Sequence, residues 1–267
     1  MKIGVITPTY NRPELLVRLH ESLFKESEGV DWIHFAVDDG SNFSYVSAIE
    51  RCVKLSNRFR YKKIFNQGAL IARNHAIDMA FSENCTHLCF IDDDDLAVNF
   101  CLQVIRDRLL EFSGSHWFIF GSNTTISHRP EWPKSPMKAR WFYDFVLKKS
   151  FPGDNLHVIS ADFVGDVRFS GRGRNQREWT FFIKLSGKDD AVMIMPELVM
   201  LIDYQLGGLT DEARKVSKSS PQSLLNNVER AYCYWRRAPF SFALIRNLLK
   251  QTLSYPVKRI AYYFNKK

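Results

Sequence analysis

The 267-residue chain lacks several features that would place it outside the ordinary globular proteins. No apolar run reaches the roughly 18 to 20 residues that a membrane-spanning helix needs. There is no internal repeat and no low-complexity segment. The start, Met1 to Ile6, is too short before Pro8 to be a signal peptide and predicts a first strand. With 45% apolar and 14% aromatic residues, the chain is expected to form one large α/β domain, or one domain with an appendage.

Cysteines are few and do not form a zinc pattern. Cys85 and Cys89 are four residues apart, but no second Cys or His pair follows at zinc-ligand spacing. The five cysteines are odd in number and lie mostly within apolar segments. Buried free thiols are typical of a reducing compartment, so the sequence predicts a cytoplasmic location.

Acidic residues are nearly missing from the end of the chain. From Lys215 onward there are eleven Lys and Arg residues against one acid, Glu229, which leaves 26 basic and 28 acidic residues before it. The net charge of +8 therefore belongs to the tail and not to the body. Because the basic stretch is confined and the body is slightly acidic, nucleic acid is not expected as a partner.

Strand and helix signals alternate through the first 122 residues, which predicts βαβ units and a mostly parallel central sheet. The expected strands are Ile3 to Thr7, Trp32 to Val37, Tyr61 to Phe65, His87 to Ile91 and His116 to Ser122. The expected helices follow Pro13, cover about 45–55, 69–81 and 100–112, and have apolar faces.

The second half is less regular. Residues 127–140 contain three prolines and predict a long irregular connection, followed by a short aromatic helix, Trp141 to Lys149. A strand near 156–159, a helix at 178–185 and two strands on either side of Pro196 are expected next. Beyond Pro221 the pattern predicts helices at 223–237, 240–253 and 257–264.

Four consecutive aspartates, Asp92 to Asp95, follow the apolar run that ends at Ile91. Like charges at the carboxyl end of a buried strand repel one another, so folding alone gives little reason to collect them there. A hard divalent cation would reverse that balance, and strand ends of this kind are where open α/β sheets bind ligands. From this run alone, a metal site and a solvated acidic helix cap remain equally open.

Three further motifs precede the aspartates: Thr7-Pro8-Thr9-Tyr10-Asn11-Arg12, Asp38-Asp39-Gly40-Ser41, and Asn66-Gln67-Gly68 followed by Ala72-Arg73-Asn74. Together with the aspartate run, this order and spacing resembles glycosyltransferase family 2. The resemblance covers about the first hundred residues. It implies the GT-A fold, with a Rossmann-like, mostly parallel sheet flanked by helices, and a nucleotide-sugar donor, with UDP-sugar favoured.

The resemblance also implies roles for individual residues. The donor site would include Thr7, Pro8, Thr9, Asp39, Arg73, Asp92, Asp93 and Asp94. Asp39 would accept a hydrogen bond from uracil, and Arg73 would face the base or the diphosphate. Asp92 and Asp94 would contact the ribose and a Mn²⁺ or Mg²⁺ ion, with Asp95 as a further metal ligand, whereas the Asp93 side chain is expected to point away.

The family places a Glu-Asp pair at the start of an aromatic-rich helix, and Arg177-Glu178-Trp179 occupies that frame here. Glu178 then stands where the family has its catalytic base, and Arg177 stands where it has Glu. A glutamate can take the proton of an acceptor hydroxyl. The alternative is that Glu178 is an acidic first-turn residue favoured by the helix dipole. The Gly/Arg loop at 170–176 would close over the donor or remain a solvated basic loop.

The expected organisation is a catalytic domain at 1–214 and a basic amphipathic helical tail at 215–267. Within the catalytic domain, 1–122 would bind the nucleotide sugar and 123–214 the acceptor. Basic residues beside aromatics at helical spacing suit a membrane interface with anionic lipid, although a helix packed on the body is the alternative. The tail would place the protein at the inner face of the cytoplasmic membrane.

The resulting hypothesis is an inverting, metal-dependent glycosyltransferase that acts on a glycan or lipid-linked glycan acceptor, such as a cell-surface polysaccharide or lipopolysaccharide intermediate. Two alternatives remain. One is a catalytically inactive nucleotide-sugar binder or membrane-docked assembly subunit, which Arg177 keeps open. The other is a nucleotidyltransferase, which would usually carry a Gly-rich basic loop after its first strand, where this chain has Pro8 to Asn11.

Overall fold

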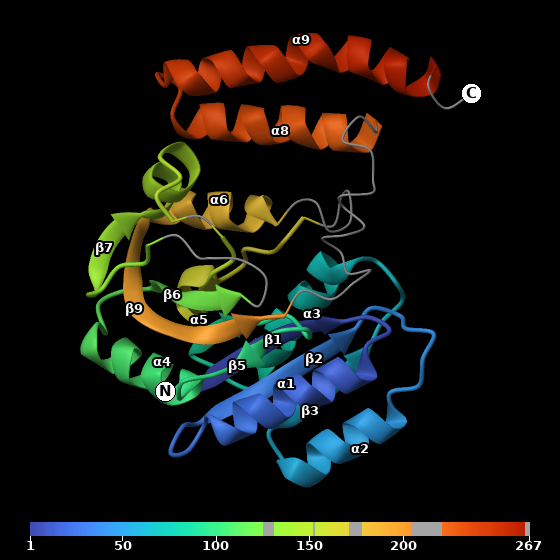
Figure 1. The fold of residues 1–267 in the computed structure, drawn as a ribbon, viewed down its shortest axis with the longest axis vertical. Coiled ribbons are helices and arrows are strands. Elements are labelled where there is room, and N and C mark those ends of the chain that lie inside the picture. Colours follow the sequence, from blue (N-terminus) through green and yellow to red (C-terminus); the bar gives the residue numbers. More distant parts are fainter. Residues whose placement is uncertain (125–130, 152, 171–177, 204–220, 265–267) are drawn as a thin grey trace.

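A nine-stranded sheet runs through the molecule, and helices cover both of its faces (Figure 1). The computed structural model describes residues 1–124, 131–151, 153–170, 178–203 and 221–264. The strand order is β3-β2-β1-β4-β8-β6-β9-β5, and β7 pairs with β9. This mixed α/β architecture confirms the predicted fold class.

The first four strands are parallel to one another and form one side of the sheet. They are β1 (Ile3–Thr9), β2 (Trp32–Asp38), β3 (Phe59–Lys63) and β4 (His87–Phe90). The connecting helices are α1 (Pro13–Lys25), α2 (Val46–Leu55) and α3 (Ala69–Ser82). Every residue of β1 and β2 is buried, as expected for parallel strands covered on both faces.

The remaining strands complete a mixed sheet. They are β5 (Leu96–Ala97), β6 (Trp117–Thr124), β7 (Met137–Arg140), β8 (Leu156–Ser160) and β9 (Ala191–Ile202). Strands β5, β7 and β8 run opposite to the others. Strand β8 lies between β4 and β6 and is antiparallel to both. It therefore joins the two halves of the sheet.

Two large apolar clusters lie on opposite faces of the sheet. One face is covered by α1 and α4 (Cys101–Glu111), whose Leu19, Leu23 and Ile105 are fully buried against Val5. The other face is covered by α3, α6 (Trp179–Lys188) and η1, a π-helical segment at Trp141–Leu147. The short helix α5 (Ala161–Val164) follows β8.

Two prolines were predicted to interrupt elements that the structure shows as continuous. Pro196 lies within β9, where the pairing with β6 shifts register between Ile119 and Ser122, and such an irregularity accommodates a residue without an N–H. Pro256 lies within the tail helix α9. The prediction of separate elements at these two points is wrong, because a proline removes one hydrogen bond without always ending the element.

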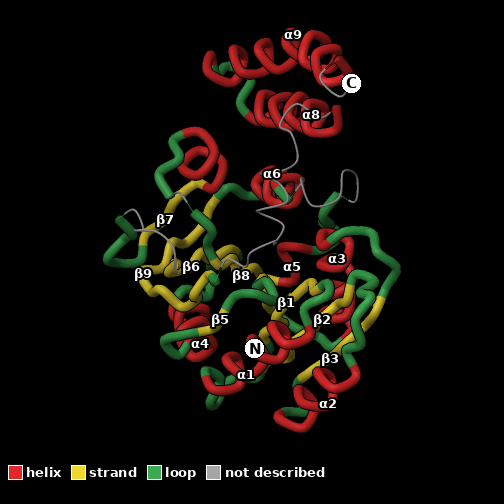
Figure 2. Tube along the Cα trace, turned by 45° about the vertical axis from the view of Figure 1, so that its right-hand side comes forward, coloured by secondary structure: helices red, strands yellow, loops and turns green. Residues whose placement is uncertain are grey.

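The tail forms two helices, α8 (Pro221–Arg237) and α9 (Phe242–Phe264). Both views place α8 between α6 and α9, so that α9 is the outermost helix (Figures 1 and 2). Side chains of α8 contact the body: Tyr234 packs edge-on against Phe142 and Trp179, and Arg237 Nη2 donates to the Ser186 carbonyl at 2.6 Å. In the described part of the chain, no helix is long and apolar enough to cross a membrane. The expected boundary between residues 214 and 215 lies outside the described residues.

Candidate functional site

Three neighbouring strands end at one edge of the sheet and bring the sequence motifs together. β1 pairs with β2 on one side and with β4 on the other. Thr9 ends β1, Asp39 directly follows β2, and Asp92 lies shortly after β4. The Asp39 amide donates to the Thr9 carbonyl at 2.9 Å, and Thr7 Oγ1 donates to the Ile91 carbonyl at 2.9 Å. The carboxyl ends of parallel strands are the usual ligand-binding edge of an α/β sheet.

The two aspartates that end β2 have different positions. Asp38 is fully buried and accepts hydrogen bonds from the Ser41 amide at 2.8 Å and from the Tyr61 hydroxyl at 2.7 Å, so it builds the turn. Asp39 accepts from the amides of Gln67 and Gly68 at 2.7 and 2.8 Å. Asp39 therefore fixes the segment that leads into α3, next to the end of β1.

Gly40 allows this close approach between the turn after β2 and the segment before α3. Its φ of +76° lies in the left-handed region, and a Cβ there would lie 2.6 Å from the Asn66 backbone nitrogen. A side chain is excluded on both grounds. Within the Asp38-Asp39-Gly40-Ser41 motif, glycine is thus the residue that this turn requires at position 40.

Arg73 projects from the first turns of α3 and joins two carboxylates. Its Nη2 lies 2.5 Å from Asp92 Oδ1, and its Nη1 lies 2.6 Å from Glu178 Oε1. The guanidinium also stacks over the Phe169 ring. Burial would lower the pKa of Arg73, but Asp92 and Glu178 outweigh it and raise the pKa above its usual value. Arg73 is therefore a permanently charged link between α3, the aspartate run and the start of α6.

The four aspartates have four different environments. The Asp92 side chain is 46% exposed, and that of Asp94 is 23% exposed. The Asp93 side chain turns inward, where Oδ2 accepts from Thr9 Oγ1 at 2.7 Å. Asp95 is also buried. The expected separation of Asp93 from Asp92 and Asp94 is present, but it arises in a turn closed by the Asp95 amide on the Asp92 carbonyl at 3.2 Å, and not on an extended backbone.

Burial and mutual repulsion shift the titration of this run. Burial raises the pKa of Asp93 to about 7, against the opposing effects of Thr9 and Arg12. Burial raises the pKa of Asp95 to about 9, and the nearby carboxylates of Asp92, Asp94 and Asp154 raise it further. The pKa of Asp94 is raised by burial and by Asp92. A cation at this edge would relieve the repulsion.

The oxygen ligands fit a divalent ion that is shared with a diphosphate. Within the described ranges, no group of three or more His, Cys, Asp or Glu side chains is arranged to hold a metal by itself. Mg²⁺, however, is usually held by one or two carboxylates together with substrate phosphates and water. The partly exposed Asp92 and Asp94 match that chemistry, and the buried Asp95 is the next residue in the chain after Asp94.

Two further arginines, Arg12 and Arg18, contact the aspartate run, and Arg12 pairs with its carboxylates. Arg12 Nη1 lies 3.2 Å from Asp93 Oδ1 and 2.8 Å from Asp94 Oδ2. Arg18 Nη2 donates to the Asp94 carbonyl at 2.7 Å, and its Nη1 pairs with Asp203 at 2.7 Å. Arg12 ends the Thr7-to-Arg12 motif, so its place in the motif was the available signal. Arg18 has no such signal, because only the packing of α1 brings it here.

Glu178 lies at the N-terminal end of α6, with its side chain half exposed. It makes no capping hydrogen bond with its side chain, and its carboxylate is directed to Arg73 instead. The structure thus brings Glu178, Arg73 and Asp92 together. Arg177 and residues 171–176 of the Gly/Arg loop lie outside the described residues.

Most of the aromatic residues between 131 and 151 pack in or against the core. Trp141 and Phe142 are buried, and Trp132 donates its indole N–H to the Met195 carbonyl at 2.7 Å. Tyr143 is 42% exposed and packs against Lys148.

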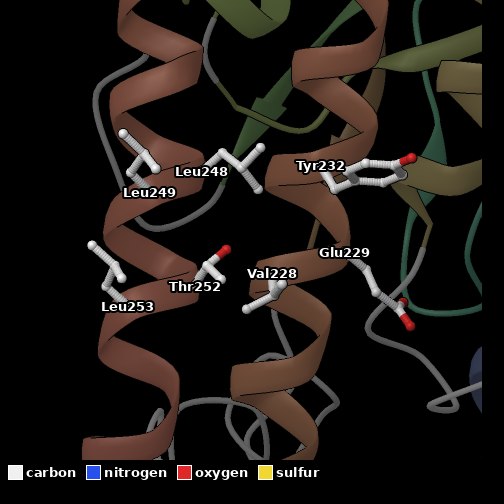
Figure 3. Close-up of a pocket in the computed structure, with 7 residues that line it drawn as sticks. All are labelled: Val228, Glu229, Tyr232, Leu248, Leu249, Thr252 and Leu253. Carbon is white, nitrogen blue, oxygen red and sulfur yellow. The ribbon is translucent and has the colours of Figure 1, made fainter.

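A separate groove of about 500 Å³ lies between the tail helices α8 and α9 (Figure 3). It is lined by Val228, Glu229, Tyr232, Leu248, Leu249, Thr252 and Leu253. Its wall is almost wholly apolar, unlike the polar edge beside the aspartates. The groove therefore differs from a nucleotide site, which needs polar groups placed toward the ligand.

Comparison with known proteins agrees with this geometry. A family model described as glycosyl transferase family 2 matches residues 4–164. No curated protein matches the chain. The crystal structure of S. aureus TarS 1–349 aligns with a TM-score of 0.68 and 15% identity, over 96% of this chain and 72% of that one. Its complex with UDP-GlcNAc aligns with a TM-score of 0.70 and 16% identity, over 96% and 73%. At these identities the likeness to TarS establishes the shared fold.

Proposed function

Because the chain belongs to glycosyltransferase family 2, it is a glycosyltransferase, and we propose that it moves a sugar from a UDP-sugar to a hydroxyl of a glycan acceptor with inversion. A nucleotide-sugar donor agrees with TarS, a protein of similar fold that has been crystallised with UDP-GlcNAc and with UDP. The donor would lie at the edge formed by Thr7, Pro8 and Thr9, with Asp39 beside the base.

The ion-pair chain Asp92–Arg73–Glu178 carries this proposal. It joins the aspartate run after β4 to the carboxylate at the start of α6 through one side chain. A transferase needs a cationic environment for the leaving diphosphate and a base near the attacking hydroxyl, both close to the same carbon. Arg73 lies between candidates for these two roles, and its charge is fixed at all working pH values.

In the proposed reaction, the acceptor oxygen attacks the anomeric carbon as the bond from that carbon to the diphosphate breaks. Glu178 takes the proton from the acceptor hydroxyl, and UDP departs with the electron pair of the broken bond. Arg73 orients the Glu178 carboxylate. Because Arg73 also bonds to Asp92, its positive charge lies where it would help to neutralise the leaving diphosphate. A single displacement of this kind inverts the configuration at the anomeric carbon.

Asp92 and Asp94 would hold Mn²⁺ or Mg²⁺, with Asp95 as a third candidate. When bound, the ion supplies charge neutralisation at the diphosphate. In the structure described here, Arg12 and Arg73 pair with Asp94 and Asp92, so metal and donor binding would require these arginines to release or share the carboxylates. The buried Asp93, bonded to Thr9, is assigned to support the loop and not to bind the ion.

The outer face of α9 supports a membrane-bound acceptor, such as a lipid-linked glycan. Exposed apolar side chains recur along this face at helical spacing, namely Phe242, Leu249, Leu253, Val257 and Ile260. Leu249 and Leu253 also border the groove beside α8. Exposed basic residues flank them, and α9 contains no Asp or Glu. An apolar stripe with basic borders suits a helix that lies in the interface of an anionic bilayer.

The opposite face of α9 already has a partner within the chain. Leu244 is buried, and α9 packs against α8, which in turn contacts α6 and η1. Helix α8 would then separate the body of the protein from the inner face of the cytoplasmic membrane, to which α9 would bind. Sedimentation of the protein with anionic vesicles measures this association.

Hydrolysis of a UDP-sugar tests the catalytic proposal without knowledge of the acceptor. We expect slow, Mn²⁺-dependent release of UDP from wild-type protein, and loss of that release in Glu178→Gln with unchanged UDP affinity. Glu14→Gln is the matched control, since Glu14 is an exposed carboxylate of α1 that pairs with Arg51 of α2. UDP binding without turnover by any sugar of a broad panel would instead favour a catalytically inactive binding subunit. Nucleotide–sugar synthesis from a nucleoside triphosphate would favour a nucleotidyltransferase.

A further inference from the structure

His157 lies on the face of the sheet that carries the proposed site. β8 pairs with β4 so that Val158 is opposite Cys89, which places His157 beside Phe90. Successive side chains alternate between the faces of a strand. Val158 belongs to the cluster under α1 and α4, so His157 belongs to the face covered by α3 and α6, and its ring centroid lies 4.4 Å from that of Phe182 on α6.

The same alternation places Asp92 beyond Phe90 on this face. The ion pair of Asp92 with Arg73 of α3 agrees with that placement. His157 is therefore the neighbour of Phe90 on the adjacent strand. Asp92 lies further along the chain from Phe90, at the edge where the donor is proposed to bind. Sequence reasoning could not assign His157, because a lone histidine in an apolar strand is usually structural.

The tautomer of His157 is set by Trp117. The indole Nε1 of Trp117 donates to His157 Nδ1 at 3.0 Å. An indole N–H only donates, so Nδ1 must accept, and the neutral imidazole then carries its proton on Nε2. Burial, with a contribution from Arg73, lowers the pKa of His157 to about 3, so the ring stays neutral at working pH. Nε2–H is a donor with a fixed protonation state.

The Nε2–H group is available for a ligand. In the described structure Nδ1 is the ring nitrogen with a protein partner, and Nε2 is on the opposite side of the five-membered ring from Trp117. His157 is only partly buried, so its ring is not fully enclosed by the core. The ring itself is held between Trp117 and Phe182, which limits its rotation.

We propose that His157 Nε2 donates a hydrogen bond to a hydroxyl oxygen of the sugar that is transferred, and so contributes to the choice of donor sugar. This inference rests on the proposed function. A neutral, oriented N–H in a half-buried position suits recognition of a hydroxyl, because a site built to bond a hydroxyl strongly rejects an analogue that lacks it. It does not suit the diphosphate, which recruits charged partners such as Arg73.

The test compares the affinities of UDP and a UDP-sugar, measured by titration calorimetry with Mn²⁺. The UDP-sugar is the member of a panel that wild-type protein hydrolyses fastest. His157→Phe keeps an aromatic ring against Phe182 and removes Nε2–H. We expect UDP affinity to remain unchanged, and the preference for the UDP-sugar over UDP to fall about tenfold, as for one lost hydrogen bond in a half-buried site.

Two further variants separate recognition from packing. His157→Gln returns an N–H near the position of Nε2 and is expected to recover most of the preference. His116→Phe is the matched control, because His116 also stacks on an aromatic ring, that of Phe163, at the other end of β8. Its preference should equal that of the wild type. If His157→Phe does not fold, the recovery by His157→Gln is compared with His157→Leu instead.

Deoxy analogues of the donor sugar provide the sharpest readout. Wild-type protein should discriminate against one deoxy position about tenfold, and His157→Phe should lose that discrimination. Unchanged discrimination in His157→Phe overturns the role of His157 and leaves the proposed function intact. Absence of hydrolysis and of UDP-sugar binding in the wild type overturns the proposed function, and the role of His157 with it.

Discussion

At the scale of single residues, the site is a set of carboxylates that are bridged in pairs by arginines. Arg12 pairs with Asp93 and Asp94, and Arg73 pairs with Asp92 and Glu178. Each arginine therefore contacts two acids at once. Planar guanidinium groups suit this arrangement better than lysine, which offers a point charge.

Asp94 is the residue on which metal binding should depend most. Asp94→Asn is expected to reduce UDP-sugar hydrolysis by at least about 100-fold and to abolish the Mn²⁺-dependent part of UDP binding. The fold should persist, because Arg12 retains Asp93 as a partner. Titration calorimetry with and without Mn²⁺ measures the effect. Asp107→Asn, an exposed aspartate paired with Arg106, serves as control, and full activity of Asp94→Asn would refute the metal assignment.

A buried pair of histidines should make stability depend on pH. His20 Nδ1 lies 3.1 Å from His34 Nδ1, and His34 Nε2 lies 3.0 Å from Thr7 Oγ1. Burial lowers the pKa of His20 to about 4 and that of His34 well below its usual value. The unfolded chain then binds more protons, so this contribution to stability is complete above pH 6.5 and is lost as the pH falls toward 4.

The difference between wild type and His20→Gln isolates this contribution, because Asp93 and Asp95 titrate in the opposite sense in both proteins. The free energy of unfolding of the wild type minus that of His20→Gln should fall by up to ~3 kcal/mol between pH 7 and pH 4. Urea denaturation at each pH measures it. His75→Gln, which replaces a partly buried histidine of α3 outside the pair, is the control. An identical slope in wild type and His20→Gln would show that His20 is not the titrating group.

At the scale of elements, the turn after β2 has the strictest backbone requirement at the site. Gly40→Ala places a Cβ against the Asn66 backbone at a positive φ, and we expect a loss of about 1 to 3 kcal/mol in the free energy of unfolding. UDP affinity should fall as well, because Asp39 and Gly68 move with the turn. Gly114→Ala, where no atom lies within 4 Å of the new Cβ, is the control. Equal stability of the two variants would contradict this account.

The elements that the sequence predicted best are those with strong local signals. β1, β2 and α3 were placed within two residues, because apolar runs and the residues between them are local features. The failures at Pro196 and Pro256 have a different cause. Whether a proline ends an element depends on the neighbouring strand or on the exposed side of a helix, and that information is tertiary.

The same distinction applies to the site. Asp39, Arg73 and the aspartates belong to motifs, so their proximity was predictable from strand order. The bond between Arg73 and Glu178 joins residues 105 positions apart, and the role of Arg18 depends on how α1 packs. His157 carries no motif, and its tautomer depends on Trp117 from another strand. These contacts required the folded structure.

At the scale of the whole molecule, the outer face of α9 should control membrane association. Leu253→Gln combined with Val257→Gln removes two exposed apolar side chains, and we expect binding to anionic vesicles to fall at least about tenfold. The free energy of unfolding should not change, since neither side chain is buried. Co-sedimentation measures binding, and Leu110→Gln, an exposed leucine on α4, is the matched control.

The lipid charge provides the second arm of this experiment. Binding to vesicles should weaken when anionic lipid is replaced by zwitterionic lipid and when salt is raised, because Arg246, Lys250, Lys258 and Arg259 border the apolar stripe. Vesicle binding that ignores both changes contradicts the proposal. A dimer that dissociates in Leu253→Gln, detected by light scattering, would instead assign this face to a second copy of the chain.

The position of β8 has a consequence for how the protein is made. Residues 156–160 fill the gap between β4 and β6, so both of those strands present open edges until the ribosome has synthesised β8. Open strand edges pair with other chains. A fragment that ends at residue 122 should therefore aggregate and show no UDP binding, even though it contains every donor-site motif. The first 122 residues would then depend on β8, later in the chain, for their solubility.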